Sequence, residues 1–363
     1  MGLTALQAES KGLGAAVSEF HGAETAARFG DPQAEFAALR SGCAVYDLGY
    51  RAKISLTGGD RVRWLNGMVT NNVRDLALSR GVYAFLLNPQ GHILGDLYAY
   101  NRGDSITVDT DASQVEKMLA TFDHYIIMDD VEVKNVSEQT TALGVAGPKA
   151  EAVLKAVGVT LPTAELQLQA YSWDGAECTV VRSDAPQFPA YEVWIAPPKV
   201  KVLWEALIAA GATAVGSEAL EMNRIVAGVP RFGVDIRERD LPQETEQARA
   251  LNFNKGCYVG QEIVERIRSR GAVHRKFTGF VADAAVVPAS KVVAGEKEVG
   301  EITSATSVLL AGTERHIAIG YIRREVGAPG REVLIGGVRA SVMAMPMREE
   351  SVASTLDLEQ RPA

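Results

Sequence analysis

The chain has 363 residues, of which 47% are hydrophobic and 23% are charged, and its formal net charge is −8. This composition is typical of an ordinary soluble globular protein with two or three domains. The acidic balance makes nucleic acid an unlikely partner, because there is no excess positive field to neutralise phosphates.

The three cysteines, Cys43, Cys178 and Cys257, lie far apart in the chain. No pairing among Cys and His has metal-ligand spacing, so we expect neither a disulfide framework nor a metal site made by protein ligands alone. Reduced thiols suit a cytoplasmic location. The N-terminus has no signal-peptide pattern, and no apolar run approaches the roughly 20 residues of a spanning helix, so we expect no membrane contact.

The N-terminal part of the chain predicts an extension followed by a first α+β lobe. Residues 1–40 are rich in Ala and Gly, and we expect an N-terminal extension that is loosely held over about its first 30 residues. The first lobe covers roughly 41–140 and contains alternating strands, a hairpin turn at 88–91 and two helices. Its expected strands are 51–56, 81–87, 92–100, 105–109 and 126–136, and its helices are 61–68 and 112–122.

The same kind of pattern then repeats, which indicates a second α+β lobe over roughly 141–270. Its expected strands are 141–146, 166–173, 177–182 and 191–195, and its helices are 148–157, 199–210 and 218–226. From residue 271 to 347, short strands separated by Gly, Pro or charged turns predict a small all-β barrel or sandwich. The acidic, polar tail at 348–363 is expected to be frayed.

One stretch carries the most specific chemistry. Cys257 lies between Gly256 and Gly260, and the run that follows Glu262 is compatible with a helix. We therefore expect Cys257 in a turn at or just before a helix N-terminus, where unpaired N–H groups favour a thiolate and Lys255 acts in the same direction. The alternative is a small, buried and inert cysteine.

The motif Lys-Gly-Cys-Tyr-x-Gly-Gln-Glu resembles the signature of the YgfZ family. These folate-binding relatives of the GcvT aminomethyltransferases act in iron–sulfur cluster assembly or maintenance. The resemblance implies an exposed, usable thiol at Cys257. The motif positions are occupied by Lys255, Gly256, Cys257, Tyr258, Gly260, Gln261 and Glu262.

A longer resemblance to the GcvT family runs from about Val45 to Ile335. It rests on several short segments in order, the clearest being Asn88–Leu97, where those aminomethyltransferases carry Asn-x-x-Gly-Gly-Ile-x-Asp-Asp-Leu. The others lie at 145–148, 223–228, 300–304 and 318–322. This resemblance implies an α+β fold of two lobes and a small C-terminal β-barrel around a central folate-binding opening.

Folate requires a carboxylate for its pterin, an apolar or aromatic wall, and a cation for its glutamate tail. By the resemblance, Glu192 is the pterin-binding glutamate and Arg224 meets the folate carboxylate. The alternatives are an exposed strand glutamate and a helix-surface arginine. Asp96 remains from the family's Asp-Asp pair, whereas Gly95 replaces the first aspartate of that pair. Val226 replaces the glutamate of the family's Leu-Arg-Leu-Glu-Ala-Gly motif. We expect Asp96 to be at most a folate contact.

The resemblance implies that tetrahydrofolate or a derivative is the cofactor. The predicted function is an accessory role in iron–sulfur cluster assembly or repair through Cys257, with assembly components or client proteins as partners. The alternatives are a folate-dependent aminomethyltransferase and a binding scaffold without chemistry, so enzymatic activity stays open; if present, it is folate-dependent one-carbon transfer. A basic cluster is predicted to be a solvated face, with RNA as the minority alternative; it comprises Arg266, Arg268, Arg270, His274, Arg275 and Lys276.

Overall fold

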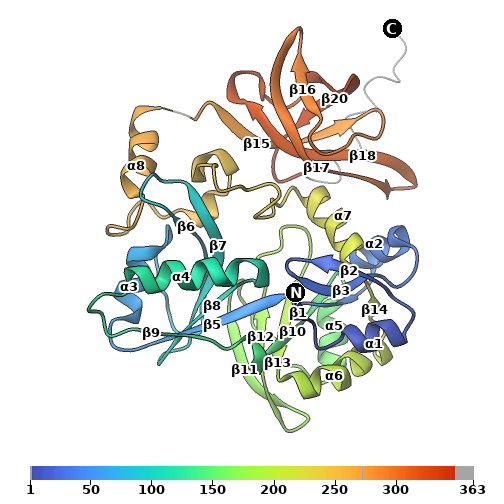
Figure 1. Ribbon diagram of the computed structural model, residues 1–363. Helices are drawn as coiled ribbons and strands as arrows, with labels where there is room; N and C mark the ends of the chain where they lie inside the picture. The colour runs from blue at the N-terminus through green and yellow to red at the C-terminus, as the bar shows by residue number, and fades with distance from the viewer. Residues whose placement is uncertain (1, 272, 348–363) are drawn as a thin grey trace. The chain divides into compact units, whose positions relative to one another are not determined.

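The computed structural model describes residues 2–271 and 273–347, and Figure 1 shows its helices and strands. The described chain divides into two compact units. Unit 1 comprises residues 2–86, 95–220 and 254–258. Unit 2 comprises residues 87–94, 221–253, 259–271 and 273–347. The tail at 348–363, predicted to be frayed, lies outside the described residues.

The N-terminal segment is a folded part of unit 1. It contains β1 (Gly2–Leu3), α1 (Gln7–Gly12), β2 (Ala16–Phe20) and β3 (Ala23–Arg28), with the strands in the order β1-β3-β2. Leu6 between them is only 1% exposed and belongs to the main hydrophobic core. The expectation of a loosely held segment is therefore wrong, because its small alanines pack a strand instead of leaving a polar extension.

A six-stranded sheet forms the centre of one half of unit 1. Its strand order is β11-β12-β13-β10-β4-β14. The strands are β4 (Ala44–Asp47), β10 (Thr141–Ala146), β11 (Leu168–Trp173), β12 (Ala176–Arg182), β13 (Ala190–Ile195) and β14 (Thr213–Ala214). Side chains of α5 (Ala150–Ala156) and α6 (Pro197–Ala209) share one core cluster with alternate residues of β12 and β13. The opposite face of these strands is therefore left for other contacts, because side chains alternate along a strand.

A five-stranded sheet in the order β6-β7-β8-β5-β9 forms the other half. Its strands are β5 (Arg51–Thr57), β6 (Gly81–Leu87), β7 (Ile93–Asn101), β8 (Ile106–Asp111) and β9 (Glu132–Asn135). The predicted hairpin turn is present, since the Gly91 N–H donates to Asn88 O at 2.9 Å and Gly91 has a positive φ of 77°. The strand β9, at 132–135, is shorter than the strand predicted at 126–136.

Two helices of this half contact each other through aromatic rings packed edge to face. The ring of Trp64 on α3 (Arg61–Met68) meets that of Phe122 on α4 (Val115–Tyr125) at a centroid distance of 5.2 Å. The 3-10 turn η1 (Ala112–Gln114) leads into α4. Two further helices are α2 (Pro32–Ser41) and α7 (Ser217–Ala227). The Asp31 carboxylate accepts a hydrogen bond from Gln33 N and caps α2.

Unit 2 contains a closed six-stranded barrel in the order β15-β18-β17-β16-β19-β20, which decides between the barrel and the sandwich. The strands are β15 (Arg275–Ala282), β16 (Lys291–Ala294), β17 (Lys297–Leu310), β18 (Thr313–Arg323), β19 (Glu332–Ile335) and β20 (Val338–Met343). Unit 2 also contains α8 (Gln261–Arg270) and three 3-10 turns, η3 (Pro242–Thr245), η4 (Ala248–Ala250) and η5 (Arg324–Val326). The predicted α+β class with a C-terminal barrel is confirmed.

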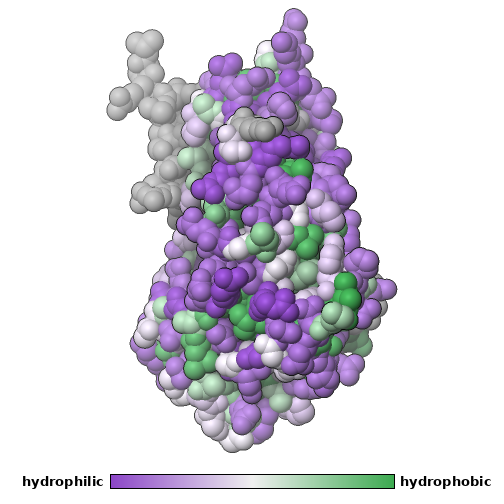
Figure 2. Space-filling view, turned by 90° about the vertical axis from the view of Figure 1, so that its left-hand side faces the viewer, coloured by the Kyte–Doolittle hydropathy of each residue, from purple (hydrophilic) through white to green (hydrophobic). Residues whose placement is uncertain are grey.

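On the face shown in Figure 2, hydrophilic residues predominate and hydrophobic ones form small groups. Such scattered apolar residues are normal for a folded chain. Within the described ranges, no helix has the length and apolarity needed to cross a membrane.

Candidate functional site

Four charged residues form a buried cluster in unit 1, built by the register of β5 and β8. That register pairs Lys53 with Asp109 and Arg51 with Asp111. Lys53 Nζ lies 2.6 Å from Asp109 Oδ1, and the Arg51 guanidinium lies 2.7 Å from Asp109 and 2.5 Å from Asp111. Burial raises the pKa of both aspartates, but their cationic neighbours outweigh it and hold each pKa below its usual value.

Asp96 on β7 is held beside this cluster. Its carboxylate accepts hydrogen bonds from the Tyr83 hydroxyl at 2.7 Å and from Gln114 Nε2 at 2.8 Å. The Asp96 N–H in turn donates to Gln114 Oε1 at 2.9 Å. Burial and the negative charge of Asp111 raise the pKa of Asp96, while Gln114, Tyr83 and Arg51 partly oppose that rise. Gln114 therefore fixes both the backbone and the side chain of Asp96.

This contact also explains the glycine before Asp96. A Cβ atom at Gly95 would lie 2.9 Å from Gln114 Oε1 and 3.7 Å from Met118 Cε. The first of these distances is too short for an unstrained contact, so a side chain at position 95 would displace Gln114. Gln114 thus occupies the place that a second carboxylate would need.

Glu192 on β13 lies in the same electrostatic neighbourhood. Its carboxylate accepts a hydrogen bond from Trp194 Nε1 at 2.8 Å. Burial, with the charge of Asp109, raises the pKa of Glu192, and Lys53 and Arg51 act against that rise. Arg51 opposes the rise in pKa of both Asp96 and Glu192, so both carboxylates lie within the electrostatic reach of this charged cluster.

A series of aromatic rings connects the two carboxylates. From Tyr83 beside Asp96, the ring centroids follow at 5.0 Å to Tyr98, 6.3 Å to Tyr100 and 5.3 Å to Trp194. Sequence reasoning missed the three tyrosines. Their signal was alternation, since Tyr98 and Tyr100 are two apart on one strand and so face the same side.

This cluster fits a folate. Glu192 and Asp96 are partly buried carboxylates that can pair with the N–H edge of a pterin, and the tyrosines form an aromatic wall for the ring that follows it. Sequence reasoning also missed Arg51 and Lys53. Their alternation with Asp109 and Asp111 on the paired strand was the available signal.

Arg224 on α7 is fully engaged within unit 2. Its Nε–H and one Nη2–H donate to the Glu221 carboxylate at 2.8 and 2.7 Å. The remaining N–H groups donate to Asp235 at 2.7 Å, to Val229 O at 3.2 Å and to Ser304 Oγ at 3.0 Å. All five N–H groups of a guanidinium are thus used. This geometry weighs against the predicted contact between Arg224 and a folate carboxylate.

The motif cysteine is exposed. The Cys257 side chain lies on the surface of unit 1, whereas Cys43 and Cys178 are buried. The helix α8 begins at Gln261, and its N-cap residue Gly260 has a φ of 81°. A Cβ at Gly260 would lie 2.6 Å from Asn88 O, which explains the glycine. Cys257 thus comes before the N-cap of α8 in the sequence.

Lys255 serves the backbone. Its Nζ donates to Asn66 O, to Val69 O at 2.6 Å and to Asn71 O at 2.8 Å, at and after the end of α3. It also lies 4.9 Å from the ring centroid of Tyr258. Burial, with the charge of Arg74, lowers the pKa of Lys255 to about 7, whereas three carbonyl acceptors favour the ammonium form. The three donors are used, so Lys255 anchors the motif rather than pairing with a thiolate.

The basic cluster is only partly a solvated face. Arg275 pairs with Asp240 at 2.7 Å and with Glu244 at 2.8 Å, and these carboxylates raise its pKa against the effect of burial. Arg268 stacks at 4.6 Å on the ring of Phe253. Arg275 is therefore a structural residue of unit 2 and not a free cation for RNA. In the described ranges, no group of three or more His, Cys, Asp and Glu residues is arranged to hold a metal ion.

Comparison with known proteins agrees with this architecture. The chain is 29% identical over 337 residues to an aminomethyltransferase of Rubrobacter xylanophilus, covering 92% of this chain and 90% of the relative. It is also 29% identical over 366 residues to an aminomethyltransferase of Streptomyces coelicolor, covering 94% and 96%.

A solved structure supports the fold. The glycine cleavage system aminomethyltransferase T from Bartonella henselae is similar, with a TM-score of 0.86 and 19% identity, over 96% of this chain and 99% of that one. At that identity the likeness establishes the fold alone. Residues 6–255 match the family model described as the GCVT N-terminal domain. The chain therefore belongs to the GCVT family.

Proposed function

We propose that this protein binds tetrahydrofolate or a derivative in unit 1 and serves iron–sulfur cluster assembly or repair through the Cys257 thiol. The observation that supports folate binding is that Asp96, Glu192 and the tyrosine series lie in one cluster. The family membership supports the same cofactor, since aminomethyltransferases of this family use tetrahydrofolate.

In this proposal the chain's own residues bind and orient the cofactor. Glu192, fixed by Trp194, accepts the N–H edge of the pterin, and the rings of Tyr83 and Tyr98 form the wall beside it. Asp96 cannot swing freely, because Tyr83 and Gln114 hold its two carboxylate oxygens. When bound, tetrahydrofolate supplies the ability to carry a one-carbon unit.

The accessory role rests on Cys257. Its thiol is exposed, while the Lys255 ammonium ties the same segment to the carbonyls that follow α3. An exposed thiol on an anchored segment is available to a partner protein without being mobile. We propose that this partner is a component of iron–sulfur assembly or a client protein, which agrees with the resemblance of the motif to the YgfZ signature.

The second candidate is a folate-dependent aminomethyltransferase, and the names of the relatives favour it. Asp96 is also retained in a buried, oriented state that suits acid–base work. Two features weigh against it. Gly95 removes the first carboxylate of the pair, and Gln114 fills the space beside it.

Two measurements separate these functions. Calorimetric titration with tetrahydrofolate is expected to give equal affinities for the natural chain and for Cys257→Ser, because the thiol is not part of the Asp96–Glu192 cluster. In cells, Cys257→Ser is expected to lower the activity of iron–sulfur enzymes, whereas Cys43→Ala, which removes a buried thiol, leaves them unchanged.

The alternative has its own assay. Release of ammonia from an aminomethylated lipoyl carrier, at a rate that depends on tetrahydrofolate and survives Cys257→Ser, would favour the aminomethyltransferase and contradict the accessory role. Normal iron–sulfur enzymes in Cys257→Ser cells would contradict the proposed role of the thiol. Absence of tetrahydrofolate binding would contradict the assignment of the buried cluster.

A further inference from the structure

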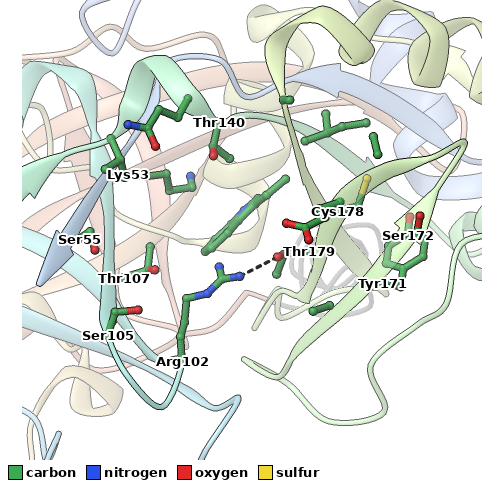
Figure 3. A pocket seen from close by; sticks show the side chains of 18 residues that line it. Lys53, Ser55, Arg102, Ser105, Thr107, Thr140, Tyr171, Ser172, Cys178 and Thr179 are labelled. Carbon is green, nitrogen blue, oxygen red and sulfur yellow. Dashed lines mark hydrogen bonds between the residues drawn. The ribbon is translucent and has the colours of Figure 1, made fainter. Parts of the chain in front are cut away.

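A cavity in unit 1 borders the Asp96–Glu192 cluster and shares Lys53 and Trp194 with it. Its volume is about 890 Å³, within the range of small-molecule pockets. Figure 3 shows Lys53, Ser55 and Thr107 on one side of it and Thr179 on the other, with Arg102 reaching across. We call this cavity the Arg102 groove. Neither the predicted folate contacts nor the Cys257 motif belongs to its lining.

The register of the two sheets builds the groove. Ser55 on β5 pairs with Thr107 on β8, so both side chains project from one face of the five-stranded sheet. Thr179 on β12 pairs with Trp194 on β13 in the same way. Lys53 Nζ lies 4.5 Å from the ring centroid of Trp194 and links the two faces. Trp194 also donates to Glu192, which is not part of the lining, so Trp194 stands between the groove and the folate cluster.

The groove offers polar groups that the protein does not use. Ser55, Thr107, Thr140 and Ser172 line it, and their hydroxyl groups have no hydrogen-bond partner among the described residues. Thr107 is only 8% exposed. The Tyr171 hydroxyl also lines the groove, and it is buried without a hydrogen-bond partner among the described residues. Buried hydroxyls normally find partners, so an unpartnered one beside four further hydroxyls indicates a ligand that both donates and accepts hydrogen bonds.

Arg102 adds a charge to this lining. It lies between β7 and β8, and its Nη2 donates to Thr179 Oγ1 at 3.1 Å, which is the one hydrogen bond of its side chain to the described residues. No described carboxylate forms a salt bridge with it, and Asp104 only partly offsets the effect of burial, which lowers the pKa of Arg102. Most of the guanidinium fork therefore remains for an oxyanion, which it can bind through two parallel hydrogen bonds.

The other charges around the groove leave Arg102 as the anchor. Lys53 is neutralised by Asp109 at 2.6 Å. Glu177, the acidic residue of the lining, is exposed to solvent, where its charge is screened. We propose that the Arg102 groove is a binding site for a small polyol that carries an oxyanion, with Arg102 holding the phosphate or carboxylate and the free hydroxyls holding the polyol.

The test is a calorimetric titration of the full chain at low salt with ribose 5-phosphate, glucuronate and ribose. Saturable binding of ribose 5-phosphate or glucuronate is expected, and the better of the two identifies the oxyanion as phosphate or carboxylate. Ribose is expected to bind at least about tenfold more weakly, because it lacks the charged group.

Variants then assign the site. Arg102→Ala is expected to lower the binding affinity for the anion at least about tenfold. Arg63→Ala, which removes an exposed arginine outside the groove, is expected to leave that affinity unchanged. Thr107→Val preserves shape but removes a hydroxyl, and about a threefold weakening is expected. Tetrahydrofolate affinity is expected to stay unchanged in Arg102→Ala and Thr107→Val, which shows that both are folded and keeps this test separate from the proposed function.

Two results would overturn the inference. One is the absence of saturable binding by either anion to the natural chain. The other is equal anion binding by the natural chain and Arg102→Ala. If Arg102→Ala is unfolded, Arg102→Gln, which is shorter and uncharged but keeps a polar side chain, replaces it with the same expectation.

Discussion

Replacing Arg224 with methionine tests whether this arginine is a structural residue or a folate ligand. The Asp235 carboxylate that it pairs with is 0% exposed. Removing one partner of a buried ion pair costs about 3–5 kcal/mol, because an uncompensated charge is left behind. Asp235 keeps hydrogen bonds from Thr303, Ser304 and the Arg231 N–H. We therefore expect the variant to lose about 3 kcal/mol of unfolding free energy, which is the lower end of that range.

The assay must report on unit 2. All four tryptophans lie in unit 1, so tryptophan fluorescence follows unit 1 alone. Hydrogen exchange of the β17 amides, measured together with urea denaturation by circular dichroism, reports on the region that contains Ser304. The matched control is Arg63→Met, because the ion pairs of this exposed arginine are screened by solvent and their loss is expected to leave stability nearly unchanged.

The structural interpretation also predicts that tetrahydrofolate affinity of the folded Arg224→Met protein stays unchanged. The reasoning is refuted if the variant is within about 1 kcal/mol of the natural chain while its folate affinity falls about tenfold or more. That outcome would restore the role that the family resemblance implies for Arg224.

Three further predictions concern unit 1. Gly95→Ala is expected to lose about 1–3 kcal/mol of unfolding free energy in urea, and Gln114→Ala in the same chain should recover part of that loss; additive effects would contradict the proposed clash. The folded-state pKa of Glu192 is raised, so its contribution to stability is present below about pH 4 and is lost as pH rises through the folded pKa. Glu192→Gln should therefore match the natural chain at low pH and become more stable than it as pH rises, as seen in denaturation midpoints; a pH-independent difference would argue against this. Lys255→Met should cost about 2 kcal/mol and speed hydrogen exchange at 66–71 and 254–258, whereas unchanged exchange there would contradict the anchoring role.

Much of the fold could be predicted because its strands follow simple local rules. The strands at 81–87 and 141–146 have the predicted bounds, since each apolar run ends at a turn that contains Pro and Gly. The N-terminal segment could not be predicted in this way. Its strands β2 and β3 are rich in alanine and charged residues, which have no strong strand preference, and tertiary packing around Leu6 decides their conformation.

The candidate site was predictable only where a motif marks it. Asp96 and Glu192 were predicted through resemblance and stay predictions, whereas Arg51 was not predicted, because its partners Asp109 and Asp111 are distant in sequence and meet it through the register of β5 and β8. Arg224 shows the opposite case. Its position on a helix was predicted. The carboxylates that accept hydrogen bonds from its guanidinium belong to Glu221 and Asp235, and only the folded chain shows that all its N–H groups are used.

The pairing of Gly95 with Gln114 has a consequence for how this chain could change over generations. Regaining a second acidic residue next to Asp96 is blocked while the glutamine remains, because its amide fills the required volume. Replacing Gln114 first with a smaller residue would remove its two hydrogen bonds to Asp96. Either order of substitution is therefore expected to pass through a destabilised intermediate, so single substitutions give little access to an acid pair at 95 and 96.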